Sequence, residues 1–248
     1  MFEFKYFLKD CIMGNFDVKV QKFLVSFIDK KGYEPVLQGL KNTLLIAIIG
    51  LVIGIIIGTI IAAVRVVPKK KTFPRVLNSI CDVYVGFFRG TPIVVQLLLT
   101  HYVFLPLIGF NLPALTVSII VFGLNSGAYV SEIMRSGIQS VDPGQMEAGR
   151  ALGLNFITTM TKIVVPQAVK NILPTLGNEF IVLVKETSVV SFVGTADIYM
   201  AFQYIGTDNY EYMIPYLVMA IIYIVLVMAI TLLVRILERR LGKSDRRS

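Results

Sequence analysis

The sequence DPGQMEAGRALGLNFITTMTKIVVPQAVKNILP, at residues 142–174, separates two hydrophobic segments and carries strong helix signals of its own. Asp142 can cap a helix whose first position is Pro143, and Gln145 can bond back to the N–H of the cap. Gly153 then predicts a left-handed end to this helix, since glycine adopts positive φ without strain. The first half of the stretch therefore predicts a short, well-defined helix.

A second short helix should follow the first after a tight turn. Asn155 can cap it, and we expect it to close before Pro166 because proline supplies no N–H and disfavours a helical predecessor. A connection with this much structure favours a docking surface over a flexible tether. We therefore interpret residues 142–174 as a helical surface held between two membrane spans.

The composition is that of a membrane protein. Hydrophobic residues make up 55% of the chain and the mean hydropathy is +0.73, which is too apolar for an ordinary soluble domain. A net charge of +8 could suggest nucleic acid as a partner, but the basic residues cluster beside the ends of hydrophobic runs, as the positive-inside rule describes. We predict an all-α integral membrane protein with no nucleic-acid partner.

Five apolar runs predict five transmembrane helices, each crossing a hydrocarbon core of about 30 Å. Within a transmembrane domain at residues 42–237 they lie at about 43–67, 77–107, 112–135, 175–193 and 212–237. Residues 1–41 alternate charged and aromatic side chains, which predicts an amphipathic segment at the outer membrane surface. Residues 238–248 are expected to form a basic cytoplasmic tail.

The distribution of Lys and Arg predicts the orientation of the spans. Five of these residues lie between the first two spans, four between positions 135 and 174, and six from Arg235 onward, whereas the other two connections have none. Under the positive-inside rule, the three basic regions are cytoplasmic. The N-terminus is then outside the cell and the C-terminus inside it.

The first span carries small residues at every fourth position: Gly50, Gly54, Gly58 and Ala62. This spacing makes one smooth strip along a helix, and small residues let a second membrane helix approach closely. We expect the strip to be a helix-packing surface. The partner helix could belong to the same chain or to another subunit.

The second span contains an arginine and a strong helix breaker. Arg89, Gln96 and Thr100 are spaced i, i+7 and i+11, which predicts that they share one helix face. Gly90-Thr91-Pro92 should bend or break the helix and free backbone carbonyls. Arg89 either lines a transport path or pairs with an acidic side chain, and the sequence leaves both readings open.

The third span places a carboxylate on a polar face. Asn125, Tyr129 and Glu132 are spaced i, i+4 and i+7, with Ser126 beside them. A carboxylate at membrane depth must face a partner or an aqueous cavity. Glu132 therefore either lines a substrate path or forms a structural ion pair, for which the candidate partners are Arg89, Arg135 and Lys185.

The fourth span is unusually polar, so hydropathy alone could miss it. Its polar side chains include Glu179, Lys185, Thr187 and Ser188. Such side chains need internal partners, which predicts a place among central helices around a path rather than against lipid.

The sequence contains no pattern typical of catalysis or of a metal site. It has one histidine and no Ser/His/Asp arrangement or metal-ligand spacing. Gly242-Lys243-Ser244 resembles the end of a phosphate-binding loop, but the first glycine of that loop is replaced by Leu237 and no strand precedes it. We expect no catalytic residue, no metal ligand and no cofactor bound by this chain.

Four motifs, in order along the chain, resemble those of ABC importer permeases. Glu147-Ala148-Gly149, followed by Gly153 and then by Ile163 and Pro166, resembles the EAA loop of that family, apart from Gly149 (usually Ala) and Val165 (usually Leu). FFRGTP at 87–92, GAYVSEIMRSGI at 127–138 and LVKETSVVS at 183–191 resemble the branch that takes up polar amino acids.

The resemblance implies a non-catalytic permease subunit of an ATP-driven importer in the bacterial cytoplasmic membrane. The implied partners are an ABC ATPase subunit dimer, an external solute-binding protein and a second permease subunit, which could be a copy of this chain or a similar one. ATP and Mg are expected in the ATPase. Residues 142–174 become the coupling loop, with six ATPase-coupling residues: Glu147, Ala148, Gly149, Gly153, Ile163 and Pro166.

The substrate is expected to be a polar amino acid. Glu132 and Glu179 favour a cationic one such as arginine, lysine or histidine, although Arg89 and Lys185 could cancel that preference or bind the α-carboxylate. The substrate-path residues are Arg89, Gln96, Asn125, Ser126, Tyr129, Glu132, Glu179, Lys185, Thr187 and Ser188.

The alternative is an ion-coupled secondary amino acid transporter that uses the intramembrane acids as a proton relay. Such transporters are typically built from internal repeats with paired broken helices. The sequence shows only one break, at 90–92.

Overall fold

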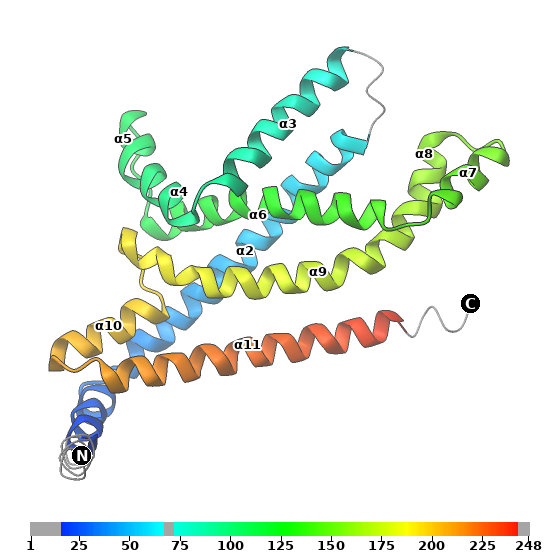
Figure 1. Cartoon of the computed structure of the whole chain (residues 1–248). Helices are drawn as coiled ribbons and strands as arrows, with labels where there is room; N and C mark the ends of the chain where they lie inside the picture. The colour runs from blue at the N-terminus through cyan, green and yellow to red at the C-terminus, as the bar shows by residue number, and fades with distance from the viewer. Residues whose placement is uncertain (1–15, 67–71, 243–248) are drawn as a thin grey trace, which may run out of the picture.

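The structure is a computed structural model that describes residues 16–66 and 72–242, and it is helical almost throughout these ranges (Figure 1). The helices are α2 (Tyr33–Val66), α3 (Thr72–Gly90), α4 (Ile93–Leu99), α5 (Leu105–Leu107), α6 (Ala114–Gln139), α7 (Pro143–Ala151), α8 (Phe156–Thr159), α9 (Val165–Glu186), α10 (Ile198–Asn209) and α11 (Met213–Gly242). Three π-helical turns and one 3₁₀ turn connect them: η1 (Val25–Asp29), η2 (Thr100–Phe104), η3 (Met160–Val164) and η4 (Thr187–Val193). The described ranges contain no strand, so the all-α prediction is confirmed.

Among the described residues, three helices are long and apolar enough to cross a membrane: α2, α6 and α11. The pair Thr72–Gly90 and Ile93–Leu107 would add a fourth span, although it is bent by 105°. Helix α9 lies against α6 and α11 but is too polar to meet the same criterion. The fourth predicted span, at about 175–193, which hydropathy alone could miss, therefore stays a prediction.

Helix α2 is longer than the first predicted span. It begins at Tyr33, whereas the span was expected to begin near residue 43, and its 34 residues extend about 51 Å at 1.5 Å per residue. A hydrocarbon core is only about 30 Å thick, so part of α2 extends beyond it. At this end Asn42 donates from Nδ2 to the carbonyl oxygen of Ala196 at 2.7 Å, which ties α2 to the segment before α10.

The glycine strip of α2 packs against α6, within the same chain. A Cβ at Gly50 would lie 3.3 Å from the Cβ of Phe122, and a Cβ at Gly54 would lie 2.5 Å from the Oγ of Ser126. One turn further along, a Cβ at Gly58 would lie 2.6 Å from Val130. Each step of four residues on α2 thus matches a step of four on α6, so the two helices run parallel and in close contact.

Residues 16–24 and η1 pack against α10 at the end of the molecule where α2 begins. Asp208 accepts hydrogen bonds from Lys30 Nζ at 2.8 Å and from Ser26 Oγ at 3.0 Å. The bond from the Lys30 ammonium and then the bond from the Ser26 hydroxyl lower the pKa of Asp208 below its ordinary value. This contact holds the predicted amphipathic segment at α10, although residues 1–15 of that segment lie outside the described residues.

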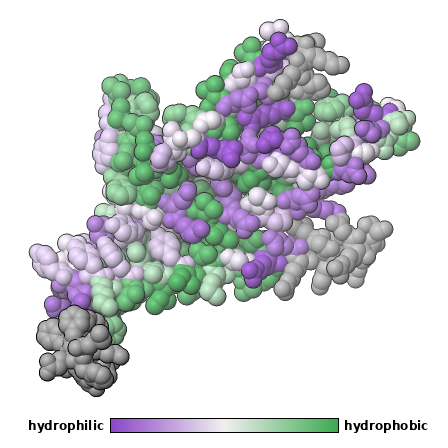
Figure 2. Space-filling view, in the orientation of Figure 1, coloured by the Kyte–Doolittle hydropathy of each residue, from purple (hydrophilic) through white to green (hydrophobic). Residues whose placement is uncertain are grey.

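The surface is divided between apolar and polar regions. Hydrophobic residues cover α11 along the lower edge of Figure 2 and gather over α4 and α5, whereas hydrophilic residues gather where α3 lies above α6. Only 6% of the spanning window of α11 is buried. Helix α11 therefore presents its surface to lipid or to another subunit, and the polar groups are concentrated over α3 and α6.

We predict that Gly58→Ala lowers the stability of the protein by about 1–3 kcal/mol, because the added methyl overlaps Val130 and the backbone of Ser131. The matched control is Gly86→Ala on α3, where a Cβ meets nothing within 4 Å and alanine is the better helix former. Thermal unfolding of the purified protein in detergent measures both changes. Equal stability of the two variants would contradict the close α2–α6 contact.

Candidate functional site

The bend between α3 and α4 is held together by Gln96. The chain turns at Gly90-Thr91-Pro92, as the sequence predicts, and the carbonyls of Phe88 and Thr91 lose their helical partners there. Gln96 Nε2 donates to Phe88 O at 2.9 Å and to Thr91 O at 3.0 Å. A buried amide thus satisfies the carbonyls that the break frees, which is what a broken helix inside a membrane requires.

The prediction that Arg89, Gln96 and Thr100 share one face is wrong. The 105° bend separates α3 from α4, so a spacing of seven residues no longer brings side chains to one side. Gln96 is buried, and its Oε1 accepts from Asn125 Nδ2 on α6 at 3.0 Å, whereas Arg89 is exposed at the end of α3. Gln96 and Asn125, both expected to line the path, bond to each other inside the protein.

Glu132 lies in an ionic cluster that joins three helices. The cluster consists of Arg65 on α2, Asp82 and Arg89 on α3, and Glu132 and Arg135 on α6. Arg65 donates through Nη1 to Glu132 and through Nη2 to Asp82. Arg135 lies 2.7 Å and Arg89 4.0 Å from the Oε2 atom of Glu132. The carboxylate thus has partners inside the protein, as a carboxylate at membrane depth needs.

Two members of this cluster were not foreseen. Arg65 belongs to the basic connection after the first span, which was expected to be cytoplasmic, and Asp82, which pairs with Arg65 and not with Glu132, was assigned no role. The signal was present in the glycine strip, because Arg65 follows Gly58 by seven residues, two helical turns along the surface that faces α6. Lys185, one of the three expected partners, forms no ion pair with Glu132.

Arg89 is the most loosely held cation of the cluster. Its side chain is 45% exposed, against 11% for Arg65, and it contacts Glu132 only at 4.0 Å. Its guanidinium carbon lies 5.5 Å from the ring centre of Tyr129, the distance of a cation–π contact. Arg89 of α3 thus contacts both Tyr129 and Glu132 of α6. Because nearly half of its side chain is exposed, the guanidinium remains accessible to an anionic group.

Glu179 on α9 is buried with little compensation. It accepts one hydrogen bond, from Ser126 Oγ at 3.1 Å, and no cation lies within ion-pair distance of it among the described residues. Ser126 is the residue that Gly54 approaches, so three helices meet at this carboxylate. A buried carboxylate without a cation is costly, and it marks a candidate functional site.

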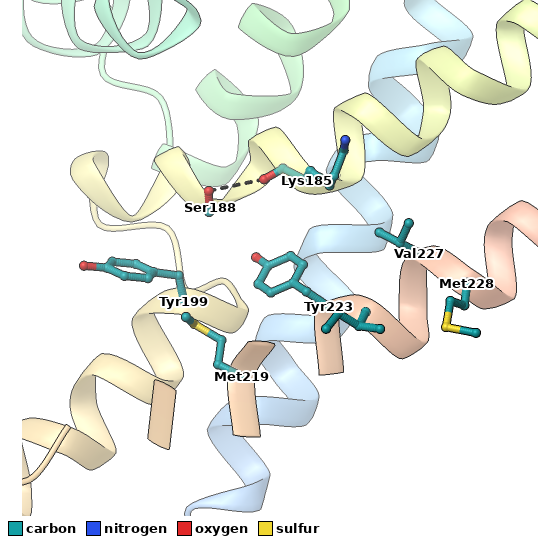
Figure 3. Close-up of a pocket in the computed structure, with 8 residues that line it drawn as sticks. Lys185, Ser188, Tyr199, Met219, Tyr223, Val227 and Met228 are labelled. Carbon is teal, nitrogen blue, oxygen red and sulfur yellow. Dashed lines mark hydrogen bonds between the residues drawn. The ribbon is translucent and has the colours of Figure 1, made fainter. Parts of the chain in front are cut away.

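Lys185 and Ser188 line a cavity of about 510 Å³ between the end of α9, α10 and α11. Figure 3 shows Tyr223 pointing into this cavity from α11, while the ammonium of Lys185 points away from Tyr223. Ser188 Oγ donates to the carbonyl oxygen of Lys185 at 3.2 Å. Thr187, the remaining expected path residue, is buried and donates to the carbonyl oxygen of Val184. The cavity is therefore mostly apolar, with few polar groups directed into it.

The first helix of the coupling loop forms as expected. Asp142 caps α7 by accepting from Gly144 N at 2.7 Å, and Gly153 has a positive φ of 82°. Gln145 departs from its expected role, since its Oε1 accepts from Gln167 Nε2 on α9 at 3.2 Å instead of bonding to the cap. The bond to Gln167 ties α7 to α9.

The prediction that the second loop helix closes before Pro166 is wrong. Asn155 caps α8 by accepting from Thr158 N at 2.8 Å, but the chain then continues through η3 into α9 without a break. Pro166 is accommodated in the first turn of α9 because the wider π turn before it changes the bonding pattern that proline would otherwise disrupt. Pro174, the expected end of the loop, also lies inside α9.

The exposed face of α7, which the resemblance implies is a coupling surface, presents Glu147 and Ala148 to solvent, while Gly149 is buried. A Cβ at Gly149 would lie 2.5 Å from Cγ2 and 2.9 Å from Oγ1 of Thr159. This contact explains why glycine occupies position 149, where alanine is usual in the EAA pattern. The close approach of Gly149 to Thr159 packs α7 against the end of α8. Ile163 lies half-buried in η3.

We predict that Glu132→Gln destabilises the protein by about 1–3 kcal/mol, because it leaves Arg65 with only one of its two carboxylate partners. In the double variant Arg65→Gln/Glu132→Gln part of this loss should be recovered, with a coupling energy of about 0.5–3 kcal/mol. A double-mutant cycle from thermal unfolding measures it. Arg89→Gln, at an exposed side chain, is the control and should change stability by less than about 0.5 kcal/mol. Strictly additive losses would contradict the pairing.

The chain is similar in sequence to membrane components of known transport systems. A family model described as "Binding-protein-dependent transport system inner membrane component" matches residues 50–243. The putative glutamine transport system permease protein GlnP of Rickettsia bellii is 37% identical over 222 residues, which cover 89% of this chain and 98% of that protein. The arginine transport system permease protein ArtQ of Bacillus subtilis is 37% identical over 210 residues, covering 85% and 94%.

Chains of solved ABC transporter structures have a fold similar to that of this protein. A chain of a crystal structure described as an amino acid ABC transporter with histidines has a TM-score of 0.78 and 40% identity, and the match covers 86% of this chain and 98% of that one. An inward-facing methionine ABC transporter shares the fold, with a TM-score of 0.70 at 18% identity. Because the family match spans most of the chain, this protein belongs to the inner-membrane components of binding-protein-dependent transport systems, the permease subunits of ABC importers.

Proposed function

We propose that this chain is the permease subunit of an ABC importer for polar amino acids and that it prefers cationic ones such as arginine, lysine and histidine. Import of amino acids by a non-catalytic permease subunit, with ATP hydrolysis in a separate subunit, follows from its family and relatives. The preference for cationic side chains is supported by one observation above all. Glu179 is a buried carboxylate that no cation neutralises within the described residues.

The two ends of an amino acid substrate match different parts of the site. Every free amino acid carries an α-carboxylate, and Arg89 is an exposed guanidinium in a cluster that has three arginines but only two carboxylates. Glu132 is occupied by Arg65 and Arg135, so it does not favour a cationic substrate. We assign the α-carboxylate to Arg89 and the cationic side chain to Glu179.

The continuous α9 helix supports a lever mechanism for coupling. It runs from beside the coupling surface, through Pro166, to Glu179 without a break. Asn171 Nδ2 donates to Ser140 Oγ at the end of α6 at 2.8 Å, so the base of α9 is also tied to α6. Displacement of α7 by an ATPase would therefore move Glu179 together with the loop.

Glu147 and Ala148 are the groups that we assign to contact with the ATPase dimer, where ATP and Mg bind. A second permease subunit, either a copy of this chain or a similar one, would cover part of the exposed α11. An external solute-binding protein would deliver the substrate at the end of the molecule that carries α10. In this assignment the N-terminus is outside and the C-terminus is cytoplasmic in a multi-pass cytoplasmic membrane protein.

The alternative of an ion-coupled secondary transporter has no support. The described helices contain one broken pair, at 90–92, and not the matched pair expected of inverted repeats. The family match assigns the chain to ATP-driven systems instead.

The substrate assignment predicts the response of ATP hydrolysis to amino acids. In the reconstituted complex with its binding protein, arginine, lysine or histidine should stimulate ATP hydrolysis most among the twenty amino acids. Glu179→Gln should reduce this stimulation by 10-fold or more without lowering the basal rate, because glutamine can still accept the hydrogen bond from Ser126 and loses only the charge that we assign to the substrate. Stimulation by glutamine or glutamate alone would overturn the cationic preference, and no stimulation by any amino acid would overturn the proposed substrate class.

The coupling assignment predicts a paired effect at α7. Gly149→Ala should force α7 away from Thr159 and lower substrate-stimulated ATP hydrolysis several-fold. Gly149→Ala/Thr159→Ala should restore it, because both atoms that the new methyl would meet first are removed. Co-purification of the ATPase with each variant gives a second readout. If the single variant couples normally, or the double variant fails to recover, this packing does not position the coupling surface.

A further inference from the structure

An apolar groove is formed partly by the coupling loop itself and has no role in the path described above. Its volume is about 470 Å³, and it runs between the last two turns of α2, the end of α6 and the corner where η3 becomes α9. Ala62 and Ala168 are buried at its floor, whereas Ile157 (72% exposed) and Val169 (39% exposed) stand at its rim. The groove is therefore a slot with small residues at the bottom and large apolar residues at the edges.

Among the described residues, the lining offers no free hydrogen-bonding side chain. Thr59 and Thr161 are the only described lining residues that carry a side-chain oxygen. Thr59 Oγ1 donates to Ile55 O at 2.6 Å and Thr161 Oγ1 donates to Ile157 O at 2.8 Å, so both hydroxyls are satisfied within their own helices. A ligand with polar groups would lose its hydrogen bonds to water without replacing them, whereas a hydrocarbon chain would not.

The position of the groove points to a lipid. In the proposed orientation, α2 reaches the cytoplasmic membrane surface at Val66, which itself lines the groove. Lys162 follows the groove residue Thr161 directly, and its side chain is exposed. Basic residues at the cytoplasmic surface attract the anionic head groups of that leaflet.

We propose that this groove binds one acyl chain of an anionic phospholipid of the inner leaflet, with the phosphate group near Lys162. The inference rests on the proposed function only for the orientation of the chain. A narrow slot with an alanine floor suits a single hydrocarbon chain better than a helix with its projecting side chains. Because its walls come from α2 and from the η3–α9 corner, a bound chain would brace the coupling loop against α2.

The test uses the complete transporter in nanodiscs that contain a phospholipid with a photoactivatable diazirine on its acyl chain, either phosphatidylglycerol or phosphatidylcholine. After illumination, mass spectrometry maps the labelled residues. We expect label on groove residues such as Met134 and Met160, at least 5-fold reduced by Ala63→Phe, which fills the slot. The matched control is Val83→Phe at an exposed position of α3, which should leave the groove label unchanged.

The head-group part of the proposal has its own readout. Lys162→Gln should reduce groove labelling by phosphatidylglycerol several-fold, to the level given by phosphatidylcholine, which it should leave unchanged. Groove label that Ala63→Phe does not reduce would overturn the lipid site. So would crosslinking of Ala63→Cys to a second permease subunit, which would identify a protein as the occupant. Amino-acid-stimulated ATP hydrolysis, measured in the same nanodiscs, separates failure of this proposal from failure of the proposed function.

Discussion

The close contact of α2 with α6 is the constraint on which the rest of the structure depends. Lipid tails are as apolar as leucine, so two membrane helices gain little from hiding apolar side chains from water. They associate here because Gly54 and Gly58 let the backbones approach, and because Phe122, Ser126 and Val130 occupy the space that absent side chains leave. This close approach also brings the side chain of Arg65 within reach of the carboxylate of Glu132 on α6.

The carboxylates of Glu132, which is partly buried, and Glu179, which is buried, have opposite surroundings. Glu132 is surrounded by arginines on its own and on neighbouring helices, so its charge is compensated inside the protein. Glu179 receives a single hydroxyl bond from Ser126 and no ion pair from the described residues. The first arrangement fixes the relative orientation of α2, α3 and α6. The second leaves a carboxylate without a cation on α9, the helix whose first turns belong to the coupling loop.

Local chemistry in the sequence predicted local structure well. Asp142 and Asn155 cap the helices expected of them, Gly153 has the expected positive φ, and Gly90-Thr91-Pro92 breaks its helix. These features depend on a few adjacent residues, so a reader of the sequence has all the information that decides them.

The failures have two physical causes: local backbone geometry at a π turn and at a bend, and contacts between segments that are distant in the sequence. The helix after α8 continues past Pro166 because the π turn before it changes the backbone hydrogen-bonding pattern, so that the N–H that proline lacks is not needed there. Gln145 bonds to Gln167 from another helix, and the bend of 105° turns Gln96 away from Arg89. Arg65 was overlooked as a partner of Glu132 because its distance along the chain hides the contact that helix packing creates.

The parallel register of α2 and α6 determines where insertions and deletions can be tolerated in this chain. The two helices are aligned by interlocking side chains and glycines, and not by the segment between them, which contains α3 to α5. Insertions or deletions in that intervening segment can therefore accumulate over evolution without shifting the pairing. A single residue inserted between Gly54 and Gly58 would instead rotate everything beyond it by about 100°. Tolerance to length variation should thus differ sharply between these neighbouring parts of one small protein.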